Sequence, residues 1–438
     1  MALIRKVRSV CPVCLKNIGA ALTEADGKIY MEKTCPEHGD FRCIVWHGKA
    51  DFQSWRGYVR PLEAGEGERC PRDCGICSGH LQGTCCVLLE VTRRCNLNCR
   101  FCFADGDRPE KSLEELKRDV DGIFTHGKPT VQLSGGEPTL RDDLPELAAY
   151  IKEKGGRYVQ LNSNGLRLAH DEAYVKALAD AGLSYVFMQF DGVTDDVYEA
   201  LRGRPLLEEK RRAIDLCGKY GLGVTLVPTV VRGVNDRQIG AVVEYARALS
   251  PVVRGVHFQP VSYFGRYPSR PEDEDRYTLD ELIFALTEQA GIKEKNIQPS
   301  RCDHPGCGLH AGFTVMENGS LMPLTWRQEE PKDEMTTAER NREYIGSRWS
   351  GAEPEKKEED SCCCCEEEDD IDLSAEPDKN SLDYFLWRAK KYSFTVTAMA
   401  FQDAMNLDVE RLRRCSLHVW SDGGLKPFCS EYLTGIGR

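Results

Sequence analysis

The chain has 438 residues, of which 41% are apolar and 29% charged, a composition typical of globular proteins with room for two or three domains. It contains no apolar run long enough to span a membrane, and its first residues, MALIRKVRSV, lack the pattern of a signal peptide. We therefore expect a cytoplasmic protein. Because cytosolic thiols stay reduced, an odd number of cysteines, 21, favours metal or iron–sulfur ligation over disulfides.

The formal net charge of −12 is concentrated in one segment. Residues 351–378 contain thirteen acidic residues against Lys356 and Lys357, and the remainder of the chain is nearly neutral. This pattern argues against a nucleic-acid partner and predicts a solvated, disordered and removable insertion. The insertion also holds Cys362 to Cys365, for which two interpretations stay open: no role, or a redox relay or metal site.

Residues 1–60 are predicted to form a small module held together by a metal. They contain CPVC, with Cys11 and Cys14, and TCPEHG, with Cys35, and their alternating polar and apolar residues indicate short strands. His38 and Cys43 compete for the position of fourth ligand. The pattern is typical of a zinc ribbon or of the one-iron rubredoxin site, and it does not distinguish zinc from iron.

A cysteine-rich linker is predicted to cover residues 61–84. It contains Cys70, Cys74 and Cys77 at spacings suited to an auxiliary [4Fe–4S] cluster. Cys85 or Cys86 either completes this ligand set or lines the strand that follows.

Residues 85–270 alternate short apolar runs with amphipathic helical segments that end at glycine. Strands that are apolar on both faces and joined by helices pair in parallel through right-handed crossovers. We therefore predict an α/β fold, an open and partial (β/α)6 TIM-like barrel. Chemistry in such barrels gathers at the carboxyl ends of the strands. The chain places residues 95–102, 135–138 and 162–164 and Asp191 there.

Residues 271–438 are predicted to form a carboxyl-terminal auxiliary-cluster region. Hairpins are expected at Asn318-Gly319 and at residues 422–424. We expect one further [4Fe–4S] cluster, with the alternative that its four candidate ligands are scattered buried thiols. The candidates are Cys302, Cys307, Cys415 and Cys429.

The segment RRCNLNCRFCFADGD places three thiols, Cys95, Cys99 and Cys102, directly after a buried strand. A [4Fe–4S] cluster needs four ligands, so three cysteines leave one iron open to the amine and carboxylate of a cofactor. With the aromatic Phe101, the segment resembles the signature of the radical S-adenosylmethionine (SAM) superfamily. The resemblance implies that a [4Fe–4S] cluster cleaves SAM reductively to a 5′-deoxyadenosyl radical that abstracts hydrogen from carbon.

The resemblance also implies cofactor-binding residues on the next strands. It assigns Gly135, Gly136, Glu137 and Pro138 to the SAM methionine amino group. From their places at strand ends, Asn162 and Ser163 are candidates for ribose hydroxyls and Asp191 for a ribose or substrate contact. Each has a purely structural reading as well. SGGEP and NSNG are turn-like, and Asp191 is a plausible helix cap. Cys217, on an amphipathic stretch, is predicted to be a core residue.

The order of motifs along nearly the whole chain resembles the group of tetraether lipid synthase and the radical SAM methylase of dihydro-6-hydroxymethylpterin. This resemblance implies auxiliary clusters, a rubredoxin-like site, and an electron donor such as ferredoxin or flavodoxin. It also implies carbon–carbon bond formation or methyl or one-carbon transfer on a lipid or pterin-like small molecule. Three alternatives stay open: a radical SAM selenoprotein-like enzyme of unassigned substrate, a peptide-modifying enzyme, and a non-catalytic electron-transfer protein.

Overall fold

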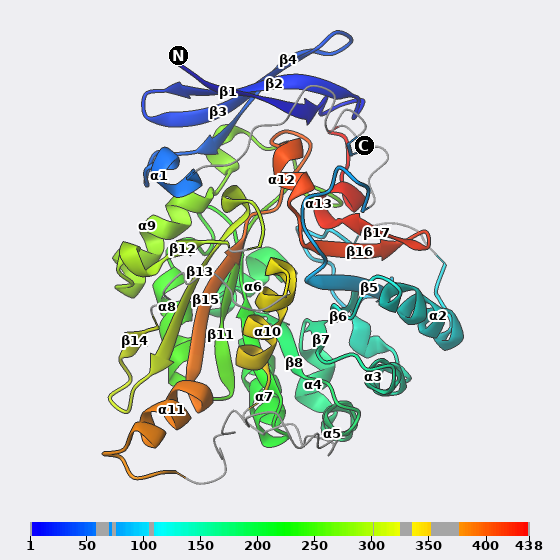
Figure 1. The fold of residues 1–438 in the computed structure, drawn as a ribbon, viewed down its shortest axis with the longest axis vertical. Coiled ribbons are helices and arrows are strands. Elements are labelled where there is room, and N and C mark those ends of the chain that lie inside the picture. Colours follow the sequence, from blue (N-terminus) through cyan, green and yellow to red (C-terminus); the bar gives the residue numbers. More distant parts are fainter. Residues whose placement is uncertain are drawn as a thin grey trace.

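The computed structural model describes residues 2–57, 70–71, 76–104, 109–300, 302–324, 335–351 and 376–436. Cys74, Cys362 to Cys365 and residues 352–375 of the acidic insertion lie outside the described residues. Two sheets form the framework: a four-stranded sheet at the amino end, and a large mixed sheet surrounded by helices (Figure 1). No helix in the described part of the chain is long and apolar enough to cross a membrane.

The amino-terminal sheet is an antiparallel meander, as the alternating sequence predicts. Its strands are β1 (Ala2–Val10), β2 (Asn17–Ala25), β3 (Lys28–Cys35) and β4 (Gly39–Trp46). Asp26 and Gly27, with φ of 53° and 74°, make the two-residue turn between β2 and β3. Leu22, Met31 and Trp46 are buried and join the main core, and the short helix α1 (Phe52–Arg56) follows.

The predicted six parallel strands are confirmed. They are β5 (Cys86–Thr92), β6 (Thr130–Gly135), β7 (Val159–Ser163), β8 (Tyr185–Gln189), β9 (Gly223–Val227) and β11 (Val253–Pro260), paired in that order. The connecting helices are α2 (Leu113–Phe124), α3 (Leu144–Glu153), α4 (Leu166–His170), α5 (Glu172–Asp180), α6 (Asp195–Arg202), α7 (Leu207–Lys219) and α8 (Ile239–Ala248). The short strand β10 (Thr229–Val230) pairs with β11.

Two strands from the carboxyl-terminal region extend this parallel sheet at both edges, which the sequence did not indicate. β15 (Ser393–Met399) pairs in parallel with β11, and β16 (Leu417–Ser421) pairs in parallel with β5. β16 continues into the expected hairpin with β17 (Gly424–Pro427), turning at Asp422-Gly423. The parallel sheet is therefore extended at both edges by residues far outside 85–270.

The other elements of the carboxyl-terminal region surround these strands. β13 (Gly308–Val315) pairs antiparallel with β15 and carries β12 (Gln298–Pro299) and β14 (Leu321–Pro323), the latter through the expected turn at Gly319. The helices are α9 (Leu279–Ala290), α10 (Thr337–Trp349), α11 (Leu382–Lys391), α12 (Val409–Arg413) and α13 (Phe428–Glu431). Single 3-10 turns are η1 (Pro138–Leu140), η2 (Asp273–Asp275), η3 (Glu294–Asn296) and η4 (Pro305–Cys307).

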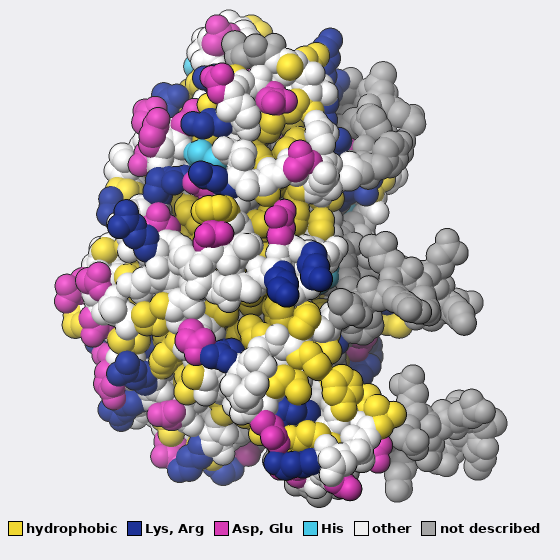
Figure 2. Space-filling view, turned by 90° about the vertical axis from the view of Figure 1, so that its left-hand side faces the viewer, with side chains coloured by type: hydrophobic (Ala, Val, Ile, Leu, Met, Phe, Trp, Pro, Cys, Tyr) yellow, Lys and Arg dark blue, Asp and Glu magenta, His cyan; other side chains and the backbone are white. Residues whose placement is uncertain are grey.

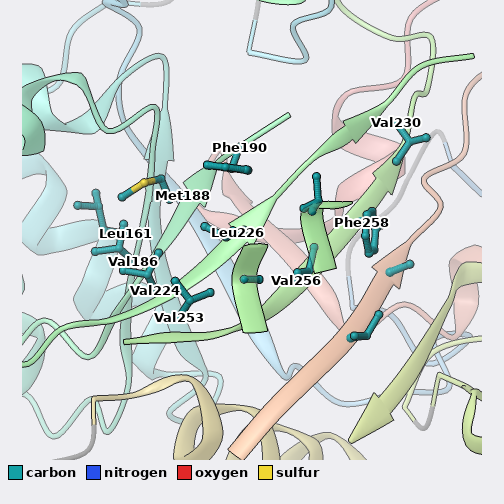
Figure 3. Close-up of a cluster of buried hydrophobic side chains, with 14 of the residues drawn as sticks. Leu161, Val186, Met188, Phe190, Val224, Leu226, Val230, Val253, Val256 and Phe258 are labelled. Atoms are coloured by element: carbon teal, nitrogen blue, oxygen red, sulfur yellow. The ribbon is translucent and has the colours of Figure 1, made fainter. Parts of the chain in front are cut away.

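Side chains of each parallel strand alternate between an outer apolar face and the barrel interior. In β8, Val186 and Met188 are fully buried in the outer core, whereas Phe187 and Gln189 line an inner cavity. Figure 3 shows part of this outer core, in which Leu161, Val186 and Val224 of neighbouring strands lie close together. The outer core holds the helices against the sheet, which leaves the inner face free to carry polar groups.

Helix α10 covers the inner cavity near the amino ends of β8, β9 and β11, in front of the sheet in Figure 1. A Cβ on Gly223 would lie 2.1 Å from the Trp349 carbonyl oxygen, so the start of β9 approaches the helix backbone closely. The buried guanidinium of Arg254 donates to the carbonyl oxygens of Arg348, Lys390 and Lys391. One cation thus joins the ends of α10 and α11 to the sheet.

Basic and acidic side chains are interspersed over the face of the molecule that Figure 2 shows. No continuous basic patch is seen among the described residues of that face. The mixture agrees with the nearly neutral charge of the chain outside its acidic insertion.

Candidate functional site

A cavity of about 350 Å³ occupies the barrel interior. Its wall includes inward side chains of β6, β8, β11 and β15, among them Gln132, Phe187, His257 and Thr397. It reaches from the carboxyl ends of these strands, where the predicted site residues lie, to Trp349 of α10. A deep cavity with a few polar groups among aromatic and aliphatic walls is the usual form of a small-molecule site.

The three signature cysteines lie together at this cavity. Cys95, Cys99 and Cys102 all line it, and Cys95 is exposed while the other two are partly buried. The loop is held by paired backbone hydrogen bonds of 2.9 Å between Cys102 and Arg266. Phe101 packs edge-to-face on Tyr263, with ring centroids 6.1 Å apart. Three thiols around one open cavity fit a [4Fe–4S] cluster that keeps one iron free for a ligand.

The two glycines of SGGEP bring the end of β6 against the cysteine loop. Gly135 has φ of 122°, and a Cβ there would lie 2.2 Å from the Thr92 carbonyl oxygen. A Cβ on Gly136 would lie 2.2 Å from the Arg94 carbonyl oxygen. Both glycines also line the cavity, and their contact with the SAM amino group stays a prediction. What the structure shows is that their lack of a side chain lets β6 approach the backbone of the cysteine loop.

Glu137 joins the ends of β6 and β7. Its buried carboxylate accepts hydrogen bonds from the Thr139 N–H and hydroxyl, from the Ser163 hydroxyl at 2.8 Å, and from the Asn164 N–H at 2.7 Å. The Ser163 hydroxyl also accepts from the Gly165 N–H at 3.0 Å. Ser163 therefore already has a donor and an acceptor partner, and its predicted ribose contact requires exchanging one of them. Asn162 lines the cavity beside it.

Pro138, unlike the other residues of the motif, is not among the cavity-lining residues. It is buried at the first position of η1, where its missing N–H leaves no donor unsatisfied. The structure therefore gives Pro138 a role in starting this turn, and nothing in its position favours direct contact with a cofactor.

Asp191 lies behind the cavity wall rather than on it. Its carboxylate accepts two hydrogen bonds of 2.7 Å from the Arg202 guanidinium and one of 3.1 Å from the Thr229 N–H. Asp191 is 1% exposed and absent from the cavity lining, and its ribose or substrate contact stays a prediction that its present hydrogen bonds do not favour. It holds Arg202, which does line the cavity.

Arg202 is the main site residue that sequence reasoning missed. It ends helix α6, is 8% exposed, donates to Asp191, and interacts electrostatically with the Cys99 thiol. Burial opposes its charge, but the Asp191 carboxylate outweighs this and raises the Arg202 pKa. A permanent cation therefore lies beside a cluster ligand. The sequence feature that could have indicated this pair is an arginine eleven residues after the aspartate that follows β8.

Two further bases, buried Lys210 and partly buried His257, support the cavity. Lys210 donates to the Gln189 side-chain oxygen at 2.9 Å and to the Asn164 carbonyl oxygen, and burial lowers its pKa to about 8. His257 pairs through Nδ1 with the Thr397 hydroxyl at 2.8 Å, and burial lowers its pKa to about 3. His257 is therefore neutral at physiological pH.

The amino-terminal ligand set is closed and mononuclear. The ligand atoms of Cys11, Cys14, Cys35 and His38 all lie within 4.8 Å of one another, as tetrahedral coordination of one ion requires. Burial raises the Cys35 pKa, but hydrogen bonds with His38 and the Glu37 N–H outweigh it and lower that pKa to about 6. Cys43 is buried elsewhere and donates to the Met405 carbonyl oxygen at 3.1 Å. The structure thus selects His38 over Cys43.

The carboxyl-terminal cysteines fall into two neighbourhoods. Cys307, Cys415 and Cys429 are close enough to interact electrostatically, and Arg411 donates to the Cys307 sulfur at 3.4 Å. Cys302 instead lies against Cys85 and 3.1 Å from the Ser416 hydroxyl oxygen. The expected four-cysteine cluster therefore stays a prediction, with Cys302 in a different neighbourhood from the other three candidates.

The cysteines that precede the barrel are only partly placed. Cys85 and Cys86 have sulfurs 3.6 Å apart, and both line the cavity. Cys70 and Cys77 are described, but Cys74 lies outside the described residues, so the linker cluster stays a prediction. Cys217 is fully buried in the outer core, as predicted.

Comparison with known proteins places this geometry in a family. Residues 89–246 match the model described as the Radical SAM superfamily, and residues 3–47 match the HMPTM N-terminal zinc ribbon domain. The chain is 34% identical to the 7,8-dihydro-6-hydroxymethylpterin dimethyltransferase of Methanocaldococcus jannaschii over 97% of this chain and 93% of the relative. It is 39% identical to the Fe-coproporphyrin III synthase of Methanosarcina barkeri over 36% of this chain and 39% of that protein.

Among solved structures, a radical SAM methyltransferase from Sphaerobacter thermophilus is 14% identical, with a TM-score of 0.37, and the match covers 65% of this chain and 73% of that one. The near-complete alignment with the dimethyltransferase is the stronger finding, because it spans the zinc ribbon, the cysteine loop and the carboxyl-terminal strands. The protein is therefore a member of the radical SAM superfamily and an iron–sulfur enzyme with an amino-terminal zinc ribbon.

Proposed function

We propose that this enzyme transfers a methyl or other one-carbon unit to a pterin-like heterocycle bound in the barrel cavity. The observation that carries the proposal is the 34% identity, over 97% of the chain, to a relative named for dimethylating 7,8-dihydro-6-hydroxymethylpterin. The cavity supports it independently, because the three cysteines and an aromatic wall border the same space. A lipid substrate has no comparable support among the described residues.

Cys95, Cys99 and Cys102 would hold the [4Fe–4S] cluster. When bound with SAM, the cluster supplies reductive cleavage to a 5′-deoxyadenosyl radical. Burial raises the Cys95 pKa to about 11, so cluster assembly must displace a proton from that thiol. Arg202 places a permanent positive charge beside Cys99, where it attracts the carboxylate of an amino-acid ligand. Asp191 fixes the guanidinium in this orientation through two hydrogen bonds.

The far end of the cavity suits a flat ring. Phe187 lies 5.4 Å from Trp349 and 5.0 Å from His257, measured between ring centroids, and all three line the cavity. Neutral His257 and the amides of Gln132 and Gln259 offer hydrogen bonds at the edge of these rings. Aromatic faces with a few directional polar groups are what a pterin-like heterocycle requires.

The test uses anaerobically reconstituted full-length protein with dithionite and SAM labelled in its methyl group. We expect 5′-deoxyadenosine and methionine to form, and labelled carbon to appear in added 7,8-dihydro-6-hydroxymethylpterin. Cys99→Ala should abolish SAM cleavage and keep the other bound metal, whereas the core variant Cys217→Ala should cleave normally. Undiminished cleavage by Cys99→Ala contradicts the cluster assignment, and cleavage without label transfer contradicts the substrate.

An auxiliary cluster held by Cys307, Cys415 and Cys429 is part of the same proposal, with Cys302 as the expected fourth ligand. What supports it is that the electrostatic neighbours of Cys415, which follows α12, include Cys307 at the end of η4 and Cys429 in α13. An electron donor such as ferredoxin or flavodoxin would supply the reducing electron. Both features are consistent with a member of the radical SAM superfamily.

A further inference from the structure

A second cavity, of about 90 Å³, lies between the amino-terminal module and the barrel. Residues of β1 to β4 and α1 form one side, and the His304 loop, α12 and the segment around Thr278 form the other. Pro260, Val261, Ser262 and Phe401 line both this cavity and the larger one, so the two are separated by a single wall. The volume exceeds that needed for a water molecule and has room for a small ion.

Arginines surround this cavity. Arg5, Arg56, Arg276 and Arg411 all line it, while Asp408 is the acidic lining residue. Arg276 is neutralised by Asp403, which accepts two hydrogen bonds from it at 2.9 and 3.2 Å. The other three arginines therefore determine the charge of the cavity.

Within the described part of the chain, these three arginines are paired with only two carboxylates. Arg5 donates to Asp408 and Glu410, and Arg56 lies 3.9 Å from the same Glu410 oxygen. Arg411 donates to the Ala400 carbonyl oxygen at 2.6 Å and to the Cys307 sulfur. Among the described residues these three cations face two carboxylates and the Cys307 sulfur, so positive charge is in excess wherever Cys307 is a neutral thiol.

His304 adds a buried donor without an acceptor. It is 3% exposed, and its Nδ1 accepts from the Gly306 N–H at 2.9 Å, so Nε2 carries the proton of the neutral ring. No described residue accepts from that Nε2, nor from the buried Nε of Arg5 or of Arg56. The Trp55 indole donates to the Pro305 carbonyl oxygen at 3.0 Å and fixes the loop against α1.

We propose that this cavity binds a phosphate group. Three buried donors around one positively charged space require an acceptor with several oxygens and negative charge, and arginine forks match phosphate oxygens well. The phosphate has two sources: free inorganic phosphate, or a phosphate ester of the heterocyclic substrate that extends through the shared wall. The second source rests on the proposed function, and the first does not.

The first experiment measures binding of inorganic phosphate to the metal-loaded full-length protein by calorimetry, without SAM or substrate. Arg56→Met and His304→Phe should each weaken binding about tenfold or more, since each removes a donor to a charged acceptor. Arg157→Met is the matched control, because this exposed arginine pairs with Glu343 on the barrel surface and should bind phosphate as the parent does. Absence of phosphate binding, or equal affinity in all four proteins, overturns the site.

A second experiment identifies the source. Binding of a hydroxymethylpterin is compared with that of its phosphate ester, in the parent and in Arg56→Met. A substrate phosphate predicts that only the ester is weakened by Arg56→Met, and that inorganic phosphate competes with it. Free phosphate predicts that neither heterocycle is affected by the substitution. Because phosphate binding is measured without turnover, failed methyl transfer would contradict the proposed function and leave the phosphate site intact.

Discussion

The zinc ribbon and the barrel cavity both use cysteine, and they arrange it in opposite ways. At the amino end, four ligands from two short loops lie within 4.8 Å of one another and leave no coordination position open. At the cavity, three cysteines of one loop border an open space of about 350 Å³. Structural metal sites are closed and catalytic ones keep an open position, so the first arrangement fits a structural role and the second fits the proposed catalytic role.

Substitution of a zinc ribbon ligand tests whether the closed site is structural, and it has the largest expected effect on stability. His38→Ala should release one metal ion per chain and unfold the module, because structural zinc contributes about 10 kcal/mol or more to small domains. Cys43→Ala is the matched control, since that thiol contacts Met405 instead of the ligand set. Metal content and limited proteolysis give the readout. Loss of the ion from Cys43→Ala alone would reverse the assignment.

Substitution of the carboxyl-terminal cysteines tests whether the protein holds an auxiliary cluster in addition to the closed zinc ribbon and the open cysteine loop. Cys307→Ser and Cys415→Ser should each lower bound iron by about four per chain, because loss of one ligand empties a cluster site. The double variant should lose no more than either single one. Cys302→Ser decides whether that residue belongs to the same cluster or to the neighbourhood of Cys85. Additive losses would show separate sites, and unchanged iron in both single variants would remove the cluster.

The parts predicted from sequence are those encoded in short stretches. Six β-α units, the cysteine loop and the CPVC–CPEHG pair each carry their signal within a few residues, and the structure has them as expected. The pairing of β15 and β16 with the edges of the parallel sheet was missed, although the hairpin that contains β16 was expected, because edge pairing joins segments more than a hundred residues apart. The choice between His38 and Cys43 has a local cause, since the β3–β4 register pairs Cys43 with Met31 and leaves His38 in the turn beside Cys35.

The Arg202–Asp191 pair shows this limit within the site itself. The position of Asp191 at a strand end suggested direct contact with the cofactor or substrate. In the structure its carboxylate instead accepts hydrogen bonds from Arg202, eleven residues later. Sequence spacing does not reveal whether a carboxylate faces a ligand or a cation. The direction becomes visible only when α6 is placed beside the cysteine loop.

Substitution of Arg202 tests the open site at the barrel cavity. Arg202→Met should destabilise the fold by about 3–5 kcal/mol, because it leaves Asp191 buried and unpaired. It should also weaken SAM binding, since the cation beside Cys99 is lost. Urea unfolding and SAM titration of the reconstituted protein give the two readouts. Arg204→Met, an exposed arginine paired with Glu209, is the control; if it and Arg202→Met behave alike, Arg202 has no role in the site.

The smallest expected effect concerns the contact that joins the two regions. Glu281 of α9 accepts from Arg232 at 2.7 Å and lies 3.0 Å from the ring of His47, which follows β4. Burial raises the Glu281 pKa, but hydrogen bonds from His47, Arg232 and the Thr278 N–H outweigh it and lower that pKa to about 2. The stability that this group contributes is therefore complete above its unfolded pKa of 4.5 and declines as pH falls towards 2.

Glu281→Gln should accordingly lower the free energy of unfolding by about 2 kcal/mol at pH 7, a value reduced for partial solvent screening. The difference between parent and variant should shrink as pH falls from about 4.5 towards 2, because protonation removes the same charge from the parent. Glu288→Gln, an exposed position on the same helix, should show no difference at any pH. Denaturant unfolding across this pH range provides the measurement. A parent–variant difference that stays constant with pH would show that Glu281 joins the zinc ribbon to the barrel by shape and not by charge.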